Sequence, residues 1–266
     1  HYLEFLQAEK ILLMSQDSIY TSFSNAASSR LKAGESTLLE KTTAETQLME
    51  VKNLLAQNQS NTLIYQSQLQ ALMNSKVPVQ VEQKAITKME LSIPNDSSAY
   101  SQNPYLLYLK QQIEISNKQK KVETDFSVFL SYANQYFDAS KRFSGFQVGV
   151  SIPLWFVPQT AKVKAAGLNQ KAIESNVEQY QTNVQSQYSQ YLQEYLQDKN
   201  TLEYYEKSAL PNADLIIKQA DKGFKNGEIG YVEYLQGIKN ALAIKSNYLI
   251  SLNQYNQSII KLEFLL

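Results

Sequence analysis

The sequence of 266 residues contains no cysteine, and its one histidine is residue 1. Without cysteine there can be no disulfide framework, thiolate zinc site or cysteine nucleophile. A single histidine leaves too few residues for Ser-His-Asp catalysis or a histidine metal cluster. No phosphate-binding loop or nucleophile–base pair stands out either. We therefore expect no catalytic, metal or cofactor site, and no enzyme activity.

Glycine and proline are also scarce, with 8 and 6 residues respectively. An α/β enzyme needs many tight turns, so this composition favours long helices with few turns. No apolar run reaches about 18 residues, which excludes a transmembrane helix. The charge is balanced, with 25 basic and 25 acidic residues. A nucleic-acid-binding protein usually has a basic surplus, so nucleic acid is not an expected partner.

Four long stretches repeat apolar residues every seven positions or in alternating steps of three and four. They are residues 1–32, 37–75, 160–222 and 229–266. This spacing keeps one face of a helix against a partner and predicts long coiled-coil-like helices. Tyrosine, glutamine and asparagine are mixed into these faces, which suggests helical assemblies with water nearby. Pro211 predicts either a kinked helix or two separate helices within the third stretch.

Two glycines mark where the first and the last pair of helices should turn. Gly34 lies between the first two stretches and Gly227 between the last two. Glycine adopts the left-handed conformation that ends a helix at little cost, and links this short make helices antiparallel. Setting Gly34 on Gly227 also places Glu35 on Glu228, at an offset of 193 residues. We therefore expect two copies of one helical hairpin.

Between the two copies the apolar period drops to two. Two alternating runs, separated by the polar segment 138–145, predict a β-hairpin with arms at 126–136 and 146–156. One face is strongly apolar, and the other is mostly small or polar. The apolar side of the second arm carries Phe146, Val148, Val150, Ile152, Leu154 and Phe156, and the other side Gln147, Gly149 and Ser151.

This hairpin allows two interpretations. Its arms have the length of tilted membrane strands, and aromatic residues gather near their ends, as at membrane interfaces. The alternative is an ordinary amphipathic hairpin on a soluble core. Two strands alone are marginally stable, and the sequence offers no further strands to complete a sheet. We favour strands of a membrane barrel.

The expected fold is thus mainly α-helical, with duplicated antiparallel helical hairpins and one β-hairpin. In order, we expect a first helical hairpin at 1–75, a connector at 76–102, a helix at 103–125, the β-hairpin at 126–156 and the second helical hairpin at 157–266.

Two groups of short motifs carry a resemblance to a known family. One is VSIPLWF at 150–156 followed by AKVKAA at 161–166, and the other is ALPNA at 209–213 before GEI at 227–229 and VEYL at 232–235. With the duplicated hairpins, these motifs resemble the TolC-like outer-membrane efflux proteins. The likeness is closest to the heavy-metal branch of the CusC and CzcC type. It is closer still to versions found in Bacteroidetes, which can be fused behind a CusA- or CzcA-like pump.

The resemblance implies a homotrimer in the outer membrane of a Gram-negative bacterium. Its strands would share one barrel, and its helices would form a hollow cylinder through the periplasm. That cylinder would meet a periplasmic adaptor protein and an inner-membrane pump of the resistance-nodulation-division (RND) class. The family has two strand pairs per protomer and this sequence has one, so we expect the first pair to be missing before His1.

The resemblance also implies functional residues. The two turns would be the periplasmic tip that docks on the adaptor, through Arg30, Leu31, Gly34, Glu35, Phe224, Gly227, Glu228 and Ile229. Glu233 would line the narrow entrance of the pore, with Glu40 as its counterpart in the first copy and Gln236 at a second gate position. The plainer interpretation is that both acids favour the positive end of their helices. Val148, Val150, Ile152 and Leu154 would face lipid.

The leading functional prediction is a passive exit duct for an efflux system, with heavy-metal cations as cargo, or drugs and other organic solutes. A pore-forming toxin with long helices and one apolar hairpin is the rival, but it gives no reason for an internal repeat. A soluble coiled-coil scaffold is a third possibility, for which the apolar hairpin would be a liability.

Overall fold

The computed structural model describes residues 1–77, 86–92, 103–124, 127–138, 141–151 and 156–265. These form two compact units. The first joins His1–Ile93 to Gln190–Phe264, and the second joins Pro94–Ser189 to Leu265–Leu266. Most of the predicted connector at 76–102 lies outside the described residues.

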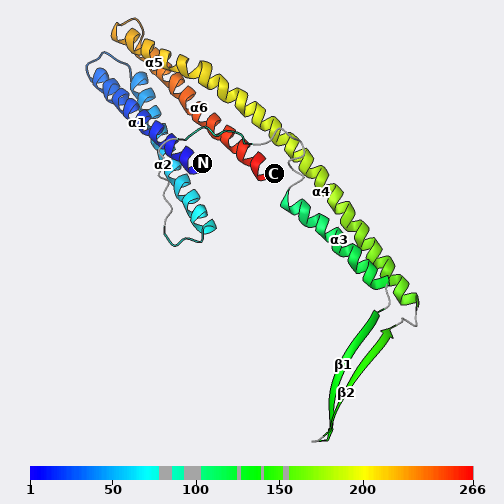
Figure 1. Ribbon diagram of the computed structural model, residues 1–266. Coiled ribbons are helices and arrows are strands. Elements are labelled where there is room, and N and C mark those ends of the chain that lie inside the picture. Colours follow the sequence, from blue (N-terminus) through cyan, green and yellow to red (C-terminus); the bar gives the residue numbers. More distant parts are fainter. Residues whose placement is uncertain (78–85, 93–102, 125–126, 139–140, 152–155, 266) are drawn as a thin grey trace. The chain divides into compact units, whose positions relative to one another are not determined.

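The first unit is a bundle of long helices (Figure 1). Helices α1 (Tyr2–Lys32) and α2 (Leu38–Leu72) form one antiparallel hairpin. The second hairpin runs from the last part of α4 (Phe156–Tyr204) through α5 (Leu210–Lys225) to α6 (Tyr231–Leu265). The sequence predicted both hairpins and their turns correctly.

The core of this unit joins the two hairpins. Its buried side chains come from α1, α2, α5 and α6, and they repeat at helical spacing along each helix. They are Leu13, Tyr20, Phe23, Ala27, Ala44, Val51, Ala220, Tyr231, Leu235, Ile238 and Leu242. Burial of each of the larger apolar side chains contributes about 1.5–3 kcal/mol, so this core stabilises the contact between the two hairpins.

Two asparagines in the predicted helix faces are buried. Asn58 is 2% exposed, and its amide donates to the Leu6 carbonyl at 2.9 Å and to Glu9 Oε2 at 2.8 Å. Asn256 is 0% exposed, and it accepts from the Met89 N–H at 3.0 Å and donates to the Thr87 carbonyl at 2.8 Å. Backbone groups and the Glu9 carboxylate therefore bind these amides inside the bundle, whereas Asn58 Oδ1 has no hydrogen-bond partner among the described residues.

A short π-helix, Tyr205–Ala209, separates α4 from α5. Its closing bond runs from the Leu210 N–H back to the Tyr205 carbonyl. Pro211 follows directly and has no N–H to continue the regular ladder, which accounts for the wider turn at this place. The sequence predicted an interruption here but not its π-helical form.

The second unit contains α3 (Pro104–Thr124), the first part of α4 and a two-stranded sheet. Asn103 caps α3: its Oδ1 accepts from the Tyr105 N–H at 3.0 Å and the Leu106 N–H at 3.2 Å. The Tyr180 hydroxyl, from α4, donates to the same oxygen at 3.2 Å. This cap and Pro104 explain why the helix begins where the sequence predicted.

Strands β1 (Ser127–Asp138) and β2 (Lys141–Ser151) pair antiparallel. Within the described residues they are the only strands. The register pairs Val128 with Val150 and Leu130 with Val148, so the apolar residues of both strands share one face, as predicted. The bounds differ from the prediction, because the ladder continues through the polar segment that was expected to be a loop. Phe156 begins α4 instead of ending a strand, and the predicted lipid-facing residues Ile152 and Leu154 lie outside the described residues.

The two faces of the hairpin differ in the described side chains. On the apolar face, Leu130, Phe146 and Val148 are 74%, 79% and 69% exposed, so none of the residues that the structure describes covers this face. On the other face, Phe129 pairs with Gly149, and its ring occupies the space that a Cβ on Gly149 would need. An aromatic ring over a glycine in this way supports a strand that lacks a side chain of its own.

Candidate functional site at the helical turns

The two turns have the same backbone structure. Gly34 and Gly227 have φ angles of +76° and +75°, the left-handed conformation that glycine adopts without strain. In the first turn, the Glu35 N–H donates to the Arg30 carbonyl at 2.9 Å and the Gly34 N–H to the Leu31 carbonyl at 3.1 Å.

The second turn repeats both bonds 193 residues later. The Glu228 N–H donates to the Gly223 carbonyl at 2.8 Å, and the Gly227 N–H to the Phe224 carbonyl at 3.1 Å. Each pair of bonds is the Schellman motif that ends a helix at a glycine. The structure thus confirms the predicted repeat at its turns, bond for bond.

The predicted docking residues divide into an exposed group and a supporting group. Gly34, Glu35, Gly227 and Glu228 are exposed, whereas Arg30, Leu31, Phe224 and Ile229 are half-buried. The Arg30 guanidinium donates from Nη2 to the Glu35 carbonyl at 3.3 Å and lies 5.7 Å from the centroid of the Tyr231 ring. A cation over an aromatic face is worth about 0.5–1 kcal/mol at exposed sites. Arg30 therefore braces the first turn against the second hairpin.

An aromatic cluster below the turns was not predicted from the sequence. The Phe224 ring stacks on Tyr234, with centroids 4.6 Å apart and planes 3° from parallel. Phe23, from α1, meets Tyr234 edge-on at 5.1 Å and Tyr231 at 6.1 Å. The signal in the sequence is the spacing of Tyr231 and Tyr234, which puts both on one face of α6 directly after the turn.

Both tyrosine hydroxyls are bound. The Tyr231 hydroxyl donates to the Phe23 carbonyl at 2.7 Å, which ties α6 to α1, and the Tyr234 hydroxyl donates to Asp221 on α5. Burial, with a smaller contribution from the Glu40 carboxylate, raises the pKa of Tyr231 to about 12. Burial and the bond to Asp221 raise the pKa of Tyr234 above its usual range. Both therefore stay neutral and keep donating at physiological pH.

The two predicted gate acids occupy equivalent positions, in the first turn of α2 and of α6. Glu233 is exposed, and its Oε2 accepts from the Gly230 N–H at 3.1 Å. Glu40 Oε2 accepts from the Ser36 hydroxyl at 2.7 Å, and the Glu40 N–H donates to Thr37 Oγ1 at 3.3 Å. These are capping interactions at helix N-termini, the plainer role that the sequence left open. Gln236 donates to Asn240 at 2.8 Å on the exposed face of α6.

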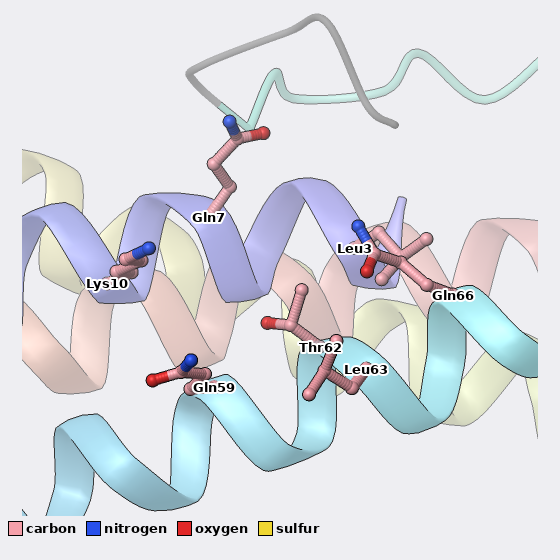
Figure 2. Close-up of a pocket in the computed structure, with 7 residues that line it drawn as sticks. All are labelled: Leu3, Gln7, Lys10, Gln59, Thr62, Leu63 and Gln66. Carbon is pink, nitrogen blue, oxygen red and sulfur yellow. The ribbon is translucent and has the colours of Figure 1, made fainter. Parts of the chain in front are cut away.

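The remaining surface of the described residues offers little for chemistry. No group of three or more acidic, cysteine or histidine side chains is placed to hold a metal ion among them. A groove of about 270 Å³ lies between α1 and α2 near the N-terminus (Figure 2). Its lining is mostly amide, hydroxyl and aliphatic: Leu3, Gln7, Lys10, Gln59, Thr62, Leu63 and Gln66. None of the described helices is apolar over a stretch long enough to cross a bilayer.

No family model matches the sequence, and no curated protein matches it. Solved structures do match over 99% of this chain. A membrane protein from Pseudomonas aeruginosa has a TM-score of 0.81 at 15% identity, the outer-membrane channel OprN 0.83 at 13%, and CusC, whose structures concern transmembrane channel formation, 0.78 at 16%. The chain spans 65%, 63% and 66% of their respective lengths, less than two thirds in each case.

These likenesses establish the fold. The described part of the chain has a TolC-like architecture of long helical hairpins with one β-hairpin, as the sequence resemblance predicted. The match to CusC is no stronger than the match to OprN, so the fold does not single out the heavy-metal branch.

Proposed function

We propose that this chain is part of a homotrimeric outer-membrane efflux channel, a passive duct with no enzyme activity. The observation that carries the proposal is the β-hairpin on a TolC-like helical body, since the described side chains of its apolar face are exposed. An exposed apolar strand pair with open edges is an aggregation hazard in water. In a bilayer, the same face would contact lipid, and strands of other subunits would pair with the open edges.

The two turns are the periplasmic tip in this proposal, and they dock on an adaptor protein that connects the duct to an RND-type inner-membrane pump. The support is their equivalence: a duct built of two similar halves offers the adaptor the same turn twice. A pore-forming toxin gives no reason for such a repeat. The exposed backbone of Gly34 and Gly227, with Glu35 and Glu228 beside them, is the contact surface.

The proposed cargo is heavy-metal cations, on the strength of the sequence resemblance. Glu233 supports cation passage, because its carboxylate is exposed on α6 and three copies would form a ring of negative charge. Its bond to the Gly230 N–H engages Oε2 alone and leaves Oε1 to face ions. Expression in an efflux-deficient host, with survival scored separately against metal salts and organic drugs, distinguishes the two classes of cargo.

Membrane insertion tests the central proposal through two neighbouring residues on opposite faces of β2. Val148 lies on the apolar face, and Gln147 on the other face opposite Ser131. A charge on a lipid-facing strand costs about 2–4 kcal/mol near the bilayer centre and much less in the lumen. Val148→Lys should therefore abolish urea-resistant association with lipid vesicles, and Gln147→Lys should retain it. Equal behaviour of the two variants would contradict the membrane role of the hairpin.

A second test concerns docking. Gly34→Val and Gly227→Val should distort the turns and weaken binding to the adaptor, while vesicle insertion stays intact. Normal efflux in cells that carry both substitutions would contradict the assignment of the tip.

A further inference from the structure

Helix α2 has two packing faces along its length. One face enters the bundle through Ala44, Val51 and Asn58, which are buried and seven residues apart. The opposite face, half a turn around the helix, carries exposed residues in alternating steps of three and four, which we call the outer stripe of α2. They are Thr42, Thr46, Met49, Asn53, Ala56, Ser60, Leu63 and Ser67. This is the spacing of a coiled-coil seam, so the outer stripe is suited to a second helical neighbour.

The chemistry of the outer stripe also suits burial. It contains no charged residue, and charge is depleted in the buried centre of protein interfaces. Hydroxyls of the stripe donate to carbonyls of their own helix: Thr46 Oγ1 to the Thr42 carbonyl at 2.8 Å, and Ser60 Oγ to the Ala56 carbonyl at 3.0 Å. Another helix can therefore cover these hydroxyls without leaving a donor unpaired. The charged residues of α2 lie on its other sides: Glu40, Lys41, Glu45, Glu50 and Lys52.

Helix α4 has a similar stripe in the part that belongs to the first unit. Its buried residues there include Tyr195 and Leu202, which are seven residues apart. The opposite face is exposed and uncharged, and we call it the outer stripe of α4. It consists of Gln193, Gln197, Asn200 and Tyr204, whereas the charged residues of this segment, Glu194, Asp198, Lys199 and Glu203, lie on other sides.

The two outer stripes lie at the same height along the bundle. Arg30 and Tyr231 are each four residues from the glycine of their turn, and they are in contact at 5.7 Å, so the two turns lie level. Ser60 is 26 residues after the first glycine, and Asn200 is 27 residues before the second. The π-helix between Asn200 and the second turn takes up the difference, because a π turn holds about one residue more than an α turn.

The spacing of the two stripes matches as well. From Ala56, the outer stripe of α2 advances by steps of four, three and four to Ser67, and from Tyr204 the outer stripe of α4 recedes by the same steps to Gln193. Because α2 leads away from its turn and α4 leads toward its own, stripes brought together are antiparallel and meet residue for residue. The small Ala56 then lies opposite the large Tyr204, which is 60% exposed in the single chain.

We propose that the outer stripe of α2 packs on the outer stripe of α4 in the next copy of the same chain. This inference rests on the proposed homotrimer and names the helix faces that join its subunits. Contact between two different faces is heterologous, and it closes into a ring when the rotation between copies is right. A rotation axis along the helices keeps every residue at its height, so the match within one chain is also the match between copies.

The extent of the outer stripe of α2 favours a second copy over another protein. An adaptor that docks at the turns needs a surface near the turns, whereas this stripe continues to Ser67. That residue is 33 residues from Gly34, about 50 Å along the helix. A partner of another kind also gives no reason for a matching stripe on α4.

Cysteine pairing tests the interface directly, because the chain has no cysteine of its own. Ser60→Cys and Asn200→Cys are purified in detergent as full chains and oxidised. Neither variant alone should form a disulfide dimer, since neither stripe meets its own copy. The two variants assembled together should form the dimer, and one chain with both substitutions should form a covalently closed trimer.

Two controls show whether the faces and their register are right. Gln193→Cys moves the second cysteine seven residues, about 10 Å, along the same stripe, so its disulfide with Ser60→Cys should be lost. Ser60→Lys places a charge in the interface and should convert trimers to monomers in size-exclusion chromatography with light scattering. Gln59→Lys places the same charge on the side of α2 that already carries Lys52, and should leave the trimer intact.

The contrary results separate this inference from the proposed function. A disulfide dimer from either single variant alone, or one that forms equally well with Gln193→Cys, would overturn the pairing of the two stripes. A trimer that lacks the disulfide between residues 60 and 200, or that survives Ser60→Lys, would overturn the interface and leave the homotrimer standing. A wild-type chain that is monomeric in both detergent and lipid vesicles would overturn both.

Discussion

The left-handed glycine at each turn allows a sharp prediction about backbone strain. A Cβ built on Gly34 or Gly227 meets no atom within 4 Å. Substitution at either position therefore causes no steric clash with the rest of the chain, and its cost is the conformational cost of a positive φ alone. For an ordinary residue this cost is about 1–2 kcal/mol.

The cost of a positive φ also predicts an order of stability among variants at residue 227. Asn tolerates a positive φ better than Ala, and β-branched Val tolerates it worst, so stability should fall from Gly through Asn and Ala to Val at residue 227. For 266 residues, a loss of 1–2 kcal/mol lowers Tm by about 2–4 °C. Thermal unfolding followed by circular dichroism at the helix band measures this shift.

Gly145→Ala is the matched control. Gly145 also has open space around a Cβ, but its φ is not positive and it lies in a strand, where alanine is no worse than glycine. It should change Tm little. If Gly227→Ala and Gly145→Ala shift Tm equally, or if Gly227→Asn is as damaging as Gly227→Val, the account of the turns is wrong.

Three further predictions concern single side chains. Tyr231→Phe removes the bond to the Phe23 carbonyl and should cost about 1 kcal/mol in urea unfolding. The pKa of Tyr231 is about 12 in the folded chain and about 10 in the unfolded chain, so the free energy of unfolding should fall as the pH rises from about 10 to about 12. This fall should be smaller in Tyr231→Phe. If the variant and the wild type have the same alkaline profile, the buried hydroxyl is not its cause. Asn256→Ala leaves the Met89 N–H and the Thr87 carbonyl without their partner and should cost about 1–3 kcal/mol, with faster proteolysis at residues 86–92; equal proteolysis would contradict the bracing role. Glu233→Gln should lower the cation preference of the assembled channel in a planar bilayer, and an unaltered preference would leave Glu233 with its capping role only.

The sequence predicted those parts of the fold that local rules determine. Helical spacing located the long helices, glycine located the two turns, and alternation located the hairpin and its apolar face. It missed the bounds of β2, because residues 141–145 pair with β1 although Phe143 is the one apolar residue among them and no apolar alternation marks them as a strand. A strand end whose side chains all face solvent has no apolar alternation, so its sequence cannot be distinguished from that of a loop.

Contacts between distant segments could not be predicted from the sequence for a different reason. The buried state of Asn58 and Asn256 depends on backbone groups of other segments, Leu6 in one case and Thr87 with Met89 in the other. The cluster around Tyr234 likewise needs a ring from α1, two hundred residues away. The sequence located the two turns and their exposed glycines, but the contact of Arg30 with the Tyr231 ring joins two distant segments and could not be inferred from either residue alone.

The spacing of buried residues along α4 has a consequence for the direction of its buried face. Val177 and Val184 are seven residues apart, and Val184 and Tyr195 are eleven apart. A seven-residue step drifts by about 20° against the turn of a straight helix, and an eleven-residue step drifts by a similar amount in the opposite sense. The two drifts cancel, so after eighteen residues the buried face has returned to its starting direction. Between Val177 and Tyr195 the buried face of α4 therefore keeps one direction along the helix, whereas a strict heptad would make it wind steadily around the helix axis.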